Sequence, residues 1–171
     1  MKVTNRPSIR CGTNKATPYL KKNWGLLWPD EYDHDYELKV LDLGCGNGRN
    51  SIFMKKEGFT NVTSFDMVDD YGTKLILGVD PIPLPCESVD IILCNFVLMF
   101  LSHKERNYLI DEIKRVARWK ATIMVELYAA KESYAPTEAK LLKMQNDIFW
   151  RIDWKKIKYS QEHFIARNVR R

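Results

Sequence analysis

Leu41-Asp42-Leu43-Gly44-Cys45-Gly46-Asn47-Gly48 is the most informative stretch of this 171-residue chain. It joins an apolar run, residues 38–43, to a helical pattern at residues 49–57. Glycines at a turn between a strand and a helix let the backbone adopt positive φ and let a ligand approach the main chain closely. The stretch therefore predicts that a nucleotide-like ligand lies on the backbone at the end of a buried strand.

The spacing of the glycines and of two acidic residues narrows the kind of ligand. A dinucleotide fingerprint has glycines at the first, third and sixth positions of the turn. Here they occupy the first, third and fifth, and Arg49 is the sixth. Asp42 precedes the turn, and Asp66 ends the next apolar run roughly 20 residues on, where a second strand brings a carboxylate to a nucleotide's ribose hydroxyls. Two carboxylates favour a cationic or hydroxyl-rich ligand over a pyrophosphate.

Length and composition indicate one globular domain. The apolar share is 45%, with five Trp, eight Tyr and seven Phe, and the chain is long enough to bury a sizeable core. No run approaches the roughly 18 apolar residues of a membrane helix, and residues 1–6 lack the apolar stretch of a signal peptide. Cys11, Cys45, Cys86 and Cys94 form no CxxC pair, which disfavours a zinc or redox site. Reduced thiols and a cytoplasmic location are therefore expected.

The net charge of +5 is uneven along the chain. Residues 1–29 contain six basic residues and no acidic one, whereas residues 151–171 contain seven basic and two acidic residues. Basic ends permit an anionic partner or substrate, including the phosphates of nucleic acid. The alternative is that both ends are solvated tails.

Strand and helix patterns alternate from residue 38 onward, which predicts βαβ units and a parallel sheet. Residues 1–37 are expected to hold a helix and loops. Residues 67–74, between the second and third strands, are near the lower limit for a crossover, so the helix there is expected to be very short or absent. Strands are expected at 38–43, 61–66, 75–79, 89–95 and 121–127, helices at 49–57, 104–118 and 137–149, and a terminal antiparallel pair at 150–154 and 163–167.

Several short motifs resemble those of the class I S-adenosylmethionine-dependent methyltransferases. Residues 44–48 are similar to motif I of that family, and Cys94-Asn95-Phe96-Val97-Leu98 is similar to motif IV. Ile82-Pro83-Leu84-Pro85 and Ser88-Val89-Asp90 are similar to the segment that leads into its fourth strand. The resemblance implies S-adenosyl-L-methionine as cofactor. It also implies a three-layer, Rossmann-like α/β fold with a seven-stranded, mostly parallel sheet and an antiparallel edge strand.

The same resemblance implies roles for individual residues. It places Asp42 near the methionine amino group through neighbouring main chain or water, Asp66 on the ribose and Met67 against the adenine. Asn95 and Phe96 border the transferable methyl group; ordinary core packing is the alternative for Met67 and Phe96. The implied cofactor-binding residues are Asp42, Gly44, Cys45, Gly46, Asn47, Gly48, Asn50, Asp66, Met67, Val79, Asp80, Asn95 and Phe96.

The chemistry of a sulfonium methyl group limits what the protein must supply. In-line positioning of the nucleophile is the main requirement, and a base is needed only when the nucleophile arrives protonated. The predicted catalytic residues are Asn95, His103, Glu126 and Tyr128, at or just beyond the ends of the fourth and fifth strands. A surface histidine is the alternative for His103. No metal site is predicted.

A closer resemblance concerns one branch of the family. Residues 44–51, Val97-Leu98-Met99-Phe100-Leu101 and Trp154-Lys155-Lys156-Ile157-Lys158-Tyr159 look like the tellurite-resistance methyltransferases. That branch methylates chalcogen oxyanions and other soft small nucleophiles. The resemblance therefore implies a small-molecule acceptor, with residues 38–171 as the cofactor-binding core. Residues 1–37 and 128–137 are expected to form a lid over the acceptor.

Two other functions remain open. An RNA or DNA methyltransferase would use the basic termini, but no Asp/Asn-Pro-Pro-Tyr/Phe motif follows the fourth strand, and Pro85-Cys86 precedes that strand instead of following it. A non-catalytic protein that binds S-adenosylmethionine as a sensor or partner module is the third hypothesis. A membrane partner is not expected.

Overall fold

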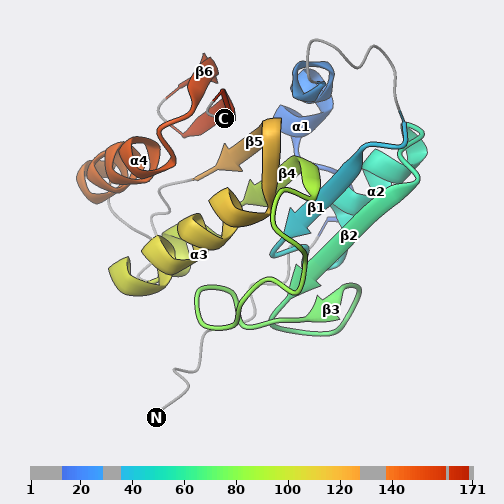
Figure 1. Cartoon of the computed structure of the whole chain (residues 1–171), viewed down its shortest axis with the longest axis horizontal. Coiled ribbons are helices and arrows are strands. Elements are labelled where there is room, and N and C mark those ends of the chain that lie inside the picture. The colour runs from blue at the N-terminus through green and yellow to red at the C-terminus, as the bar shows by residue number, and fades with distance from the viewer. Residues whose placement is uncertain (1–12, 29–35, 128–137, 161, 170–171) are drawn as a thin grey trace.

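The computed structural model describes residues 13–28, 36–127, 138–160 and 162–169. A seven-stranded sheet runs through the middle of the molecule, with helices on both of its faces (Figure 1). The structure is therefore a three-layer α/β fold, as the sequence predicts.

The strand order is β3-β2-β1-β4-β5-β7-β6. Neighbouring strands are parallel from β3 to β5, and β7 runs antiparallel to both β5 and β6. The sheet is thus mostly parallel with an antiparallel pair at one edge, which confirms the expected sheet. The strands are β1 Lys39–Leu43, β2 Asn61–Asp66, β3 Thr73–Lys74, β4 Val89–Asn95, β5 Ala117–Glu126, β6 Lys155–Tyr159 and β7 His163–Arg167.

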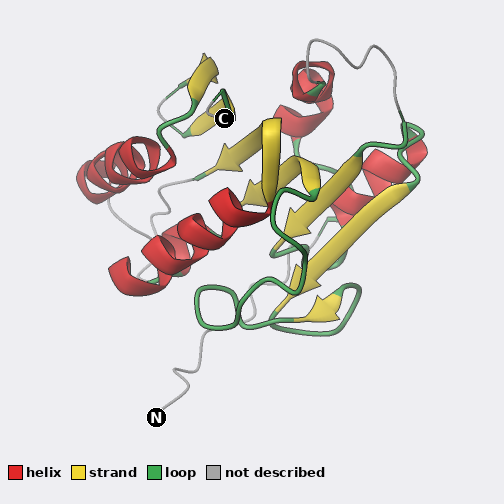
Figure 2. Ribbon diagram, viewed as in Figure 1, coloured by secondary structure: helices red, strands yellow, loops and turns green. Residues whose placement is uncertain are grey.

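Alternating side chains of the strands build one apolar layer on each face of the sheet. Val40 and Leu93 pack with Leu20 on the face that α1 and α2 cover, and Leu41 and Ile92 pack on the face that α3 and α4 cover. Successive side chains of a strand point to opposite faces, so each apolar run supplies both layers. The helices of the two layers are seen in Figure 2: α1 Pro18–Asn23, η1 Trp24–Leu27, α2 Arg49–Lys56, η2 Leu98–Phe100, α3 His103–Val116 and α4 Glu138–Ile152.

The helix α3 shows how local sequence sets an element's position. The Ser102 side chain accepts a hydrogen bond from the Glu105 N–H, and the Glu105 carboxylate accepts one from the Ser102 N–H, which is a complete capping box. Leu109, Ile113 and Val116 follow at helical spacing and are buried. The helix ends where β5 begins, so the chain passes directly from the outer layer into the sheet.

No helix lies between β2 and β3, which confirms the expected shortened crossover. Residues 67–72 instead fold back onto the sheet. A Cβ on Gly72 would lie 2.6 Å from the Ser64 carbonyl oxygen and 2.7 Å from the Cys45 Sγ atom. Only glycine therefore allows this segment to pack so closely on β2 and on the turn after β1.

The expected strand at residues 75–79 is wrong. The third strand is only Thr73–Lys74, and the residues after it form a turn in which the N–H groups of Val79 and Asp80 both donate to the Ile76 carbonyl. Gly78 has φ 82° there, and the Asp80 carboxylate accepts a hydrogen bond from the Ile76 N–H. The turn chemistry of glycine and aspartate overrides the apolar pattern of the run.

The expected strand at residues 150–154 is also wrong. The helix α4 continues to Ile152, and the last strand pair is β6 with β7. Leu141, Ile148 and Ile152 are all buried, and their spacing places them on one face of a helix. The alternation of apolar and polar residues at 150–154 fits a strand as well, but helical burial against α3 decides the structure.

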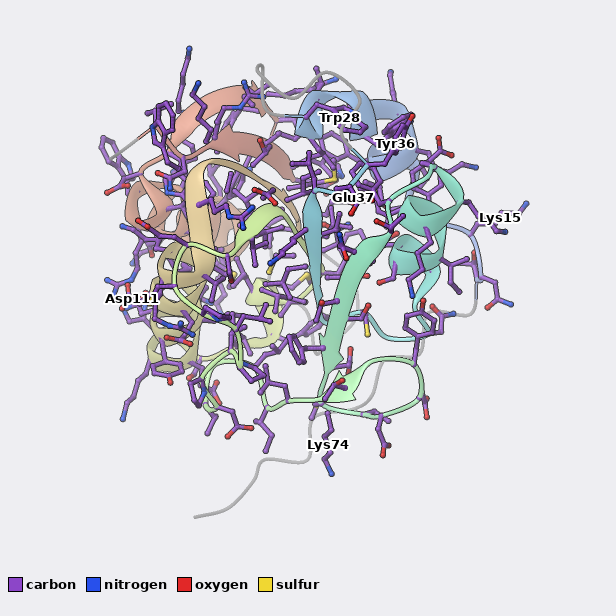
Figure 3. All side chains as sticks on the ribbon, turned by 45° about the vertical axis from the view of Figure 1, so that its right-hand side comes forward. Lys15, Trp28, Tyr36, Glu37, Lys74 and Asp111 are labelled. Carbon is purple, nitrogen blue, oxygen red and sulfur yellow. The ribbon has the colours of Figure 1, made fainter. Side chains whose placement is uncertain are left out.

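The aromatic residues of the N-terminal segment separate into two places. Trp28 packs against Phe59, with ring centroids 4.9 Å apart, and against Tyr36, with centroids 5.3 Å apart. Figure 3 shows Trp28 and Tyr36 side by side at the end of the sheet where β1 and β2 begin. The glycine turn follows the other end of β1, so these two side chains do not cover a ligand on that turn.

Candidate functional site

The glycine turn, residues 44–48, joins β1 to α2 and contains three glycines with positive φ. A Cβ on Gly44 would lie 2.2 Å from the Val97 Cγ2 atom, so glycine is required for the loop after β4 to pack on the turn. A Cβ on Gly46 would have no atom within 4 Å, and Gly46 is exposed. The turn therefore presents open backbone at Gly46, on which a ligand has room to lie.

Asp66 lies beside this open backbone. Its carboxylate accepts a hydrogen bond from the Gly46 N–H at 2.8 Å and another from the Val68 N–H at 3.2 Å. A carboxylate offers about four lone-pair sites, so acceptor capacity remains for ligand hydroxyls. The structure thus brings together the turn and the acidic residue that the sequence predicts as partners.

Asp42 is buried beneath the turn and does not face open space. Its carboxylate accepts a hydrogen bond from the Ser51 hydroxyl at 2.5 Å, and Ser51 Oγ lies 2.8 Å from Ser64 Oγ. Burial raises the pKa of Asp42 to about 6. The contacts join β1, β2 and α2, so Asp42 fixes the position of the turn from below.

Asn95 ends β4 and is 7% exposed. Neither its amide nitrogen nor its amide oxygen has a hydrogen-bond partner among the described residues. Buried polar groups are rarely unpartnered, because each costs about 1–3 kcal/mol when it is left so. An amide placed in this way, at the same end of the sheet as the glycine turn, is suited to pairing with a bound molecule.

Glu126 ends β5 in direct register with Asn95, and its side chain lies on the same face of the sheet. It is 1% exposed and accepts a short hydrogen bond from the Thr17 hydroxyl. Burial raises the pKa of Glu126 to about 7, although the Thr17 hydrogen bond and the nearby Arg49 guanidinium oppose this shift. A carboxylate that titrates near neutral pH in a buried site is able to exchange a proton.

The segment before α1 lies over this edge of the sheet. The Thr17 N–H donates to the Asn50 side-chain oxygen at 3.0 Å. The Asn47 amide nitrogen donates to the Thr13 carbonyl at 3.3 Å and to the Asn14 side-chain oxygen at 3.2 Å. Two predicted cofactor-site residues, Asn47 and Asn50, thus hold residues 13–17 in place.

The remaining predicted cofactor residues line the turn and the loops beside it. Cys45 is buried beside Gly72, and burial raises the pKa of its thiol to about 12, so it stays protonated at neutral pH. Gly48 lies directly under the Tyr71 ring. Met67 and Phe96 are half-buried, Phe96 with φ 60°, and Val79 is 42% exposed.

No contact that the structure describes brings His103 to Asn95 or Glu126. It is exposed at the start of α3, and its Nε2 atom lies 3.0 Å from the Asn107 amide nitrogen. Tyr128 and the predicted lid at 128–137 lie outside the described residues.

Three residues of the site were not singled out by the sequence. Thr17 and Tyr19 come from the cap and first turn of α1, and His163 begins β7 in register with Glu126. The His163 Nε2 atom lies 3.7 Å from Glu126 Oε2, and its ring stacks on Tyr19 with centroids 4.3 Å apart. The register between β5 and β7 is the signal that brings His163 to this place, and it is visible only in the folded sheet.

An open pocket of about 570 Å³ adjoins the site. Lys15, Lys21, Lys22 and Arg49 are four of its seven lining residues, and Figure 3 shows Lys15 beside α2. Its lining comes from residues 13–22 and from Arg49 at the start of α2, and Gly46 is not among the lining residues. Its positive charge favours an anionic ligand.

Two classes of site receive no support from the part of the chain that the structure describes. Within it, no group of three or more His, Cys, Asp or Glu side chains is arranged to hold a metal ion. No described helix is both long enough and apolar enough to cross a membrane.

Comparison with known families assigns this arrangement. Residues 41–125, from the middle of β1 to the last but one residue of β5, match the family model described as a methyltransferase domain. This stretch is a methyltransferase domain. A search of curated protein sequences finds no match to the chain.

Solved structures of similar fold agree with the methyltransferase domain. The Aquifex aeolicus S-adenosylmethionine-dependent methyltransferase is 20% identical, with a TM-score of 0.57 over 90% of this chain and 98% of that one. The Burkholderia thailandensis 1,6-didemethyltoxoflavin-N1-methyltransferase, solved with 1,6-didemethyltoxoflavin and S-adenosylhomocysteine bound, is 14% identical, with a TM-score of 0.58 over 77% and 71%. The [4+2]-cyclase SpnF is 14% identical, with a TM-score of 0.55 over 72% and 53%, so this chain spans about half the length of that protein.

S-adenosylmethionine is the cofactor of the methyltransferase domain, and the residues present fit it. Gly46 leaves open backbone for a ligand, Asp66 has carboxylate lone pairs for ribose hydroxyls, and the two polar atoms of the Asn95 amide have no partner within the described part of the chain. The seven-stranded topology and the domain match support a class I methyltransferase. The comparisons do not confirm that the protein belongs to the tellurite-resistance branch.

Proposed function

We propose that this protein transfers a methyl group from S-adenosylmethionine to a small-molecule acceptor by in-line displacement. The observation that carries the proposal is the pair of unpartnered amide atoms of Asn95, buried at the end of β4 beside the glycine turn. An unsatisfied amide is costly to the fold, so its presence there is explained by a bound ligand that completes it.

The bound cofactor supplies an electrophilic methyl group, and the protein's task is to place a nucleophile in line with it. Gly46 and Asp66 hold the cofactor's ribose side, and we assign Met67, Val79 and Asp80 to its adenine side. Asn95 orients the groups at the transferable methyl. Glu126, in register with Asn95, receives a proton when the acceptor carries one.

The form of the site supports a small acceptor. Residues 13–17 lie across the edge of the sheet through hydrogen bonds from Thr17 to Asn50 and Glu126. We propose that these residues are the described part of a lid, which would leave room for a small molecule and not for a duplex. The Burkholderia methyltransferase with the same fold holds 1,6-didemethyltoxoflavin, a small molecule.

The basic pocket favours one alternative. Lys15, Lys21, Lys22 and Arg49 form no ion pair with another described residue, so they are available to an anion. An oxyanion acceptor, as in the tellurite-resistance branch, or an RNA or DNA backbone would use this charge. A steep fall of affinity with salt, together with methyl incorporation into the polymer, would favour nucleic acid.

The cyclase SpnF shares this fold, so fold alone does not establish methyl transfer. Turnover therefore has to be measured. A labelled-methyl transfer screen with tellurite, selenite, thiols, amines, RNA and DNA as acceptors is the direct test. We expect transfer to at least one small acceptor and none to the nucleic acids. Cofactor binding without turnover across the panel would instead support a sensor or partner module.

Asn95→Leu separates a functional role of this residue from a structural one. Leucine has a similar volume and no polar atoms, so the variant is expected to unfold at a higher temperature than the wild type while it transfers methyl groups more slowly. Thermal unfolding and transfer rate are measured on the same samples. Unchanged transfer together with increased stability would contradict the role proposed for Asn95.

The described cysteines support a cytoplasmic location as part of the proposal. Cys45, Cys86 and Cys94 are free thiols, and Cys45 and Cys94 are buried. Free thiols persist in reducing compartments.

A further inference from the structure

We propose that Glu126, His163 and Ser160 form a relay that carries a proton from the acceptor to the surface, and that the acceptor is a nucleophile that arrives protonated, with an N–H, O–H or S–H group. This inference rests on the proposed methyl transfer and names its acceptor class. It also assigns a role in proton transfer to β7 and to the turn before it, which lie beyond the residues that match the domain model.

The three side chains form a path for proton transfer from the buried Glu126 carboxylate to the surface. The Glu126 Oε2 atom lies 3.7 Å from His163 Nε2, and His163 Nδ1 lies 3.2 Å from Ser160 Oγ. The side chain of Glu126 is 2% exposed, that of His163 is 25% exposed, and Ser160 is on the surface. The first distance is longer than a hydrogen bond, and such contacts commonly tighten when the substrate complex forms.

Local structure holds the imidazole in this place. Ser160 and His163 close the hairpin between β6 and β7, in which the Ser160 N–H donates to the His163 carbonyl at 2.8 Å. The Tyr19 ring stacks on the imidazole with an angle of 19° between the planes. One side of the ring is thus covered by α1, and its two nitrogens face Glu126 and Ser160.

The charged and titratable groups around the relay come from four elements. Arg49 of α2, Tyr19 of α1 and His163 of β7 face Glu126, and Glu162 acts on His163 from the hairpin. Burial raises the pKa of Glu126 to about 7 and lowers the pKa of His163 below its ordinary value. Both shifts favour the uncharged form of each group, so a protonated Glu126 carboxyl faces a neutral imidazole, one nitrogen of which is able to accept a proton.

The step balances with one proton transferred. A bond forms between the acceptor atom and the methyl carbon, the bond from that carbon to sulfur breaks, and its electron pair stays on sulfur. The acceptor's proton passes to the ionised Glu126 carboxylate, then to His163, and leaves through Ser160 to water. A nucleophile already ionised in solution, such as an oxyanion, has no proton to give and makes no use of this relay.

The first test needs no turnover. The His163 imidazole is titrated by NMR in the wild type and in Glu126→Gln, with Asp147→Asn, an exposed carboxylate of α4, as the matched control. Because neighbouring groups that interact titrate as a pair, Glu126→Gln is expected to shift the His163 titration, whereas the control leaves it unchanged. Identical His163 titrations in the wild type and in Glu126→Gln would overturn the relay.

The second test uses acceptors that differ in their own proton. With 4-nitrothiophenol, which is ionised at neutral pH, and 2-mercaptoethanol, which is not, Glu126→Gln is expected to slow transfer to the protonated thiol by about 100-fold or more and to leave the ionised thiol nearly unaffected. His163→Ala is expected to slow the same reaction less, with partial rescue by added imidazole. Equal losses for both thiols would overturn the proposed acceptor class.

Calorimetric binding of S-adenosylmethionine is measured on every variant. Retained cofactor binding together with a selective loss of transfer to the protonated thiol supports the relay. If the wild type binds no cofactor, the proposed function itself fails, and the imidazole titration still decides whether Glu126 and His163 act as a pair.

Discussion

The glycine turn and the Glu126–His163 cluster lie at the same edge of one sheet but are built in different ways. The turn consists of consecutive residues, 44–48, and its partner Asp66 is 20 residues away from Gly46 along the chain. The cluster joins Thr17 to Glu126 across 109 residues and adds His163 from the last strand. The proposed ligand site can therefore be predicted from local sequence, whereas the proposed reactive cluster is assembled by the sheet topology.

The two regions also differ in what they leave unsatisfied. At the turn, the Gly46 backbone is open and Asp66 is bound by two N–H groups. In the cluster, the described contacts of the buried Glu126 carboxylate are one hydroxyl donor and an imidazole 3.7 Å away, and the Asn95 amide has no hydrogen-bond partner among the described residues. The turn is thus preorganised for binding, whereas the cluster holds the groups that chemistry would use. The predictions below alter one region or the other.

The largest effect on stability is expected at Gly44. Gly44→Ala places a Cβ 2.2 Å from Val97 Cγ2 at a residue with φ 71°. Overpacking and left-handed strain together are expected to lower the free energy of unfolding by about 3 to 5 kcal/mol. Thermal and denaturant unfolding measure this loss.

Gly46→Ala is the matched control for that change. Its Cβ meets no atom, so about 1 to 2 kcal/mol of left-handed strain is the only cost to the fold. Cofactor affinity should fall more in this variant than its stability does, because the methyl group takes the place of the ligand. Unchanged cofactor affinity in Gly46→Ala would contradict the assignment of the Gly46 backbone to the ligand.

The next largest effect is expected from Glu126→Gln, as a change in pH dependence. Between pH 4.5 and about 7, the folded protein keeps a proton that the unfolded chain has released, so wild-type stability falls as the pH rises through this window. Glu126→Gln removes this dependence of stability on pH. The free energy of unfolding of the variant, relative to that of the wild type, should therefore increase by about 3 kcal/mol between pH 4 and pH 8.

Denaturant unfolding at several pH values measures the difference between the two proteins. Asp147→Asn controls for the loss of one carboxylate. A constant difference between the wild type and Glu126→Gln from pH 4 to pH 8 would show that the Glu126 carboxyl is not held protonated by burial.

Asp66→Ala tests the turn with a smaller effect, on ligand binding. Loss of a charged acceptor for the ribose hydroxyls is expected to weaken S-adenosylmethionine binding about tenfold to a hundredfold. Titration calorimetry measures the affinity. Asp66→Asn keeps one acceptor oxygen, so its affinity should lie between those of the wild type and Asp66→Ala. Unaltered affinity in Asp66→Ala would place the ribose elsewhere.

The smallest effect is expected at Thr17, which links α1 to the cluster. Thr17→Val removes both the donor to Glu126 and the helix cap that accepts from the Leu20 N–H, at a cost of about 1 to 2 kcal/mol. The loss should be larger at pH 8 than at pH 5, because the lost donor stabilises the ionised carboxylate. Thr17→Ser keeps the hydroxyl and should resemble the wild type; an equal loss in both variants would point to packing instead.

The sequence singles out the turn and two residues of the cluster, Asn95 and Glu126, but not Thr17 or His163, for a physical reason. Gly44, Gly46 and Asp66 act through backbone conformation and strand order, which short spacings encode. The expected strands at 75–79 and 150–154 failed because a glycine–aspartate turn and helical burial at Ile152 outweighed the apolar alternation. His163 could not be paired with Glu126 from the sequence, since their contact depends on the register of an antiparallel strand added at the sheet edge.

The measurement that tests this account most directly is a crystal structure with S-adenosylhomocysteine bound. The account predicts that the ligand lies on the open backbone of Gly46, with its ribose on Asp66 and its sulfur facing Asn95. A ligand seated instead in the basic pocket of Lys15, Lys21, Lys22 and Arg49, with Asn95 still unpartnered, would contradict it.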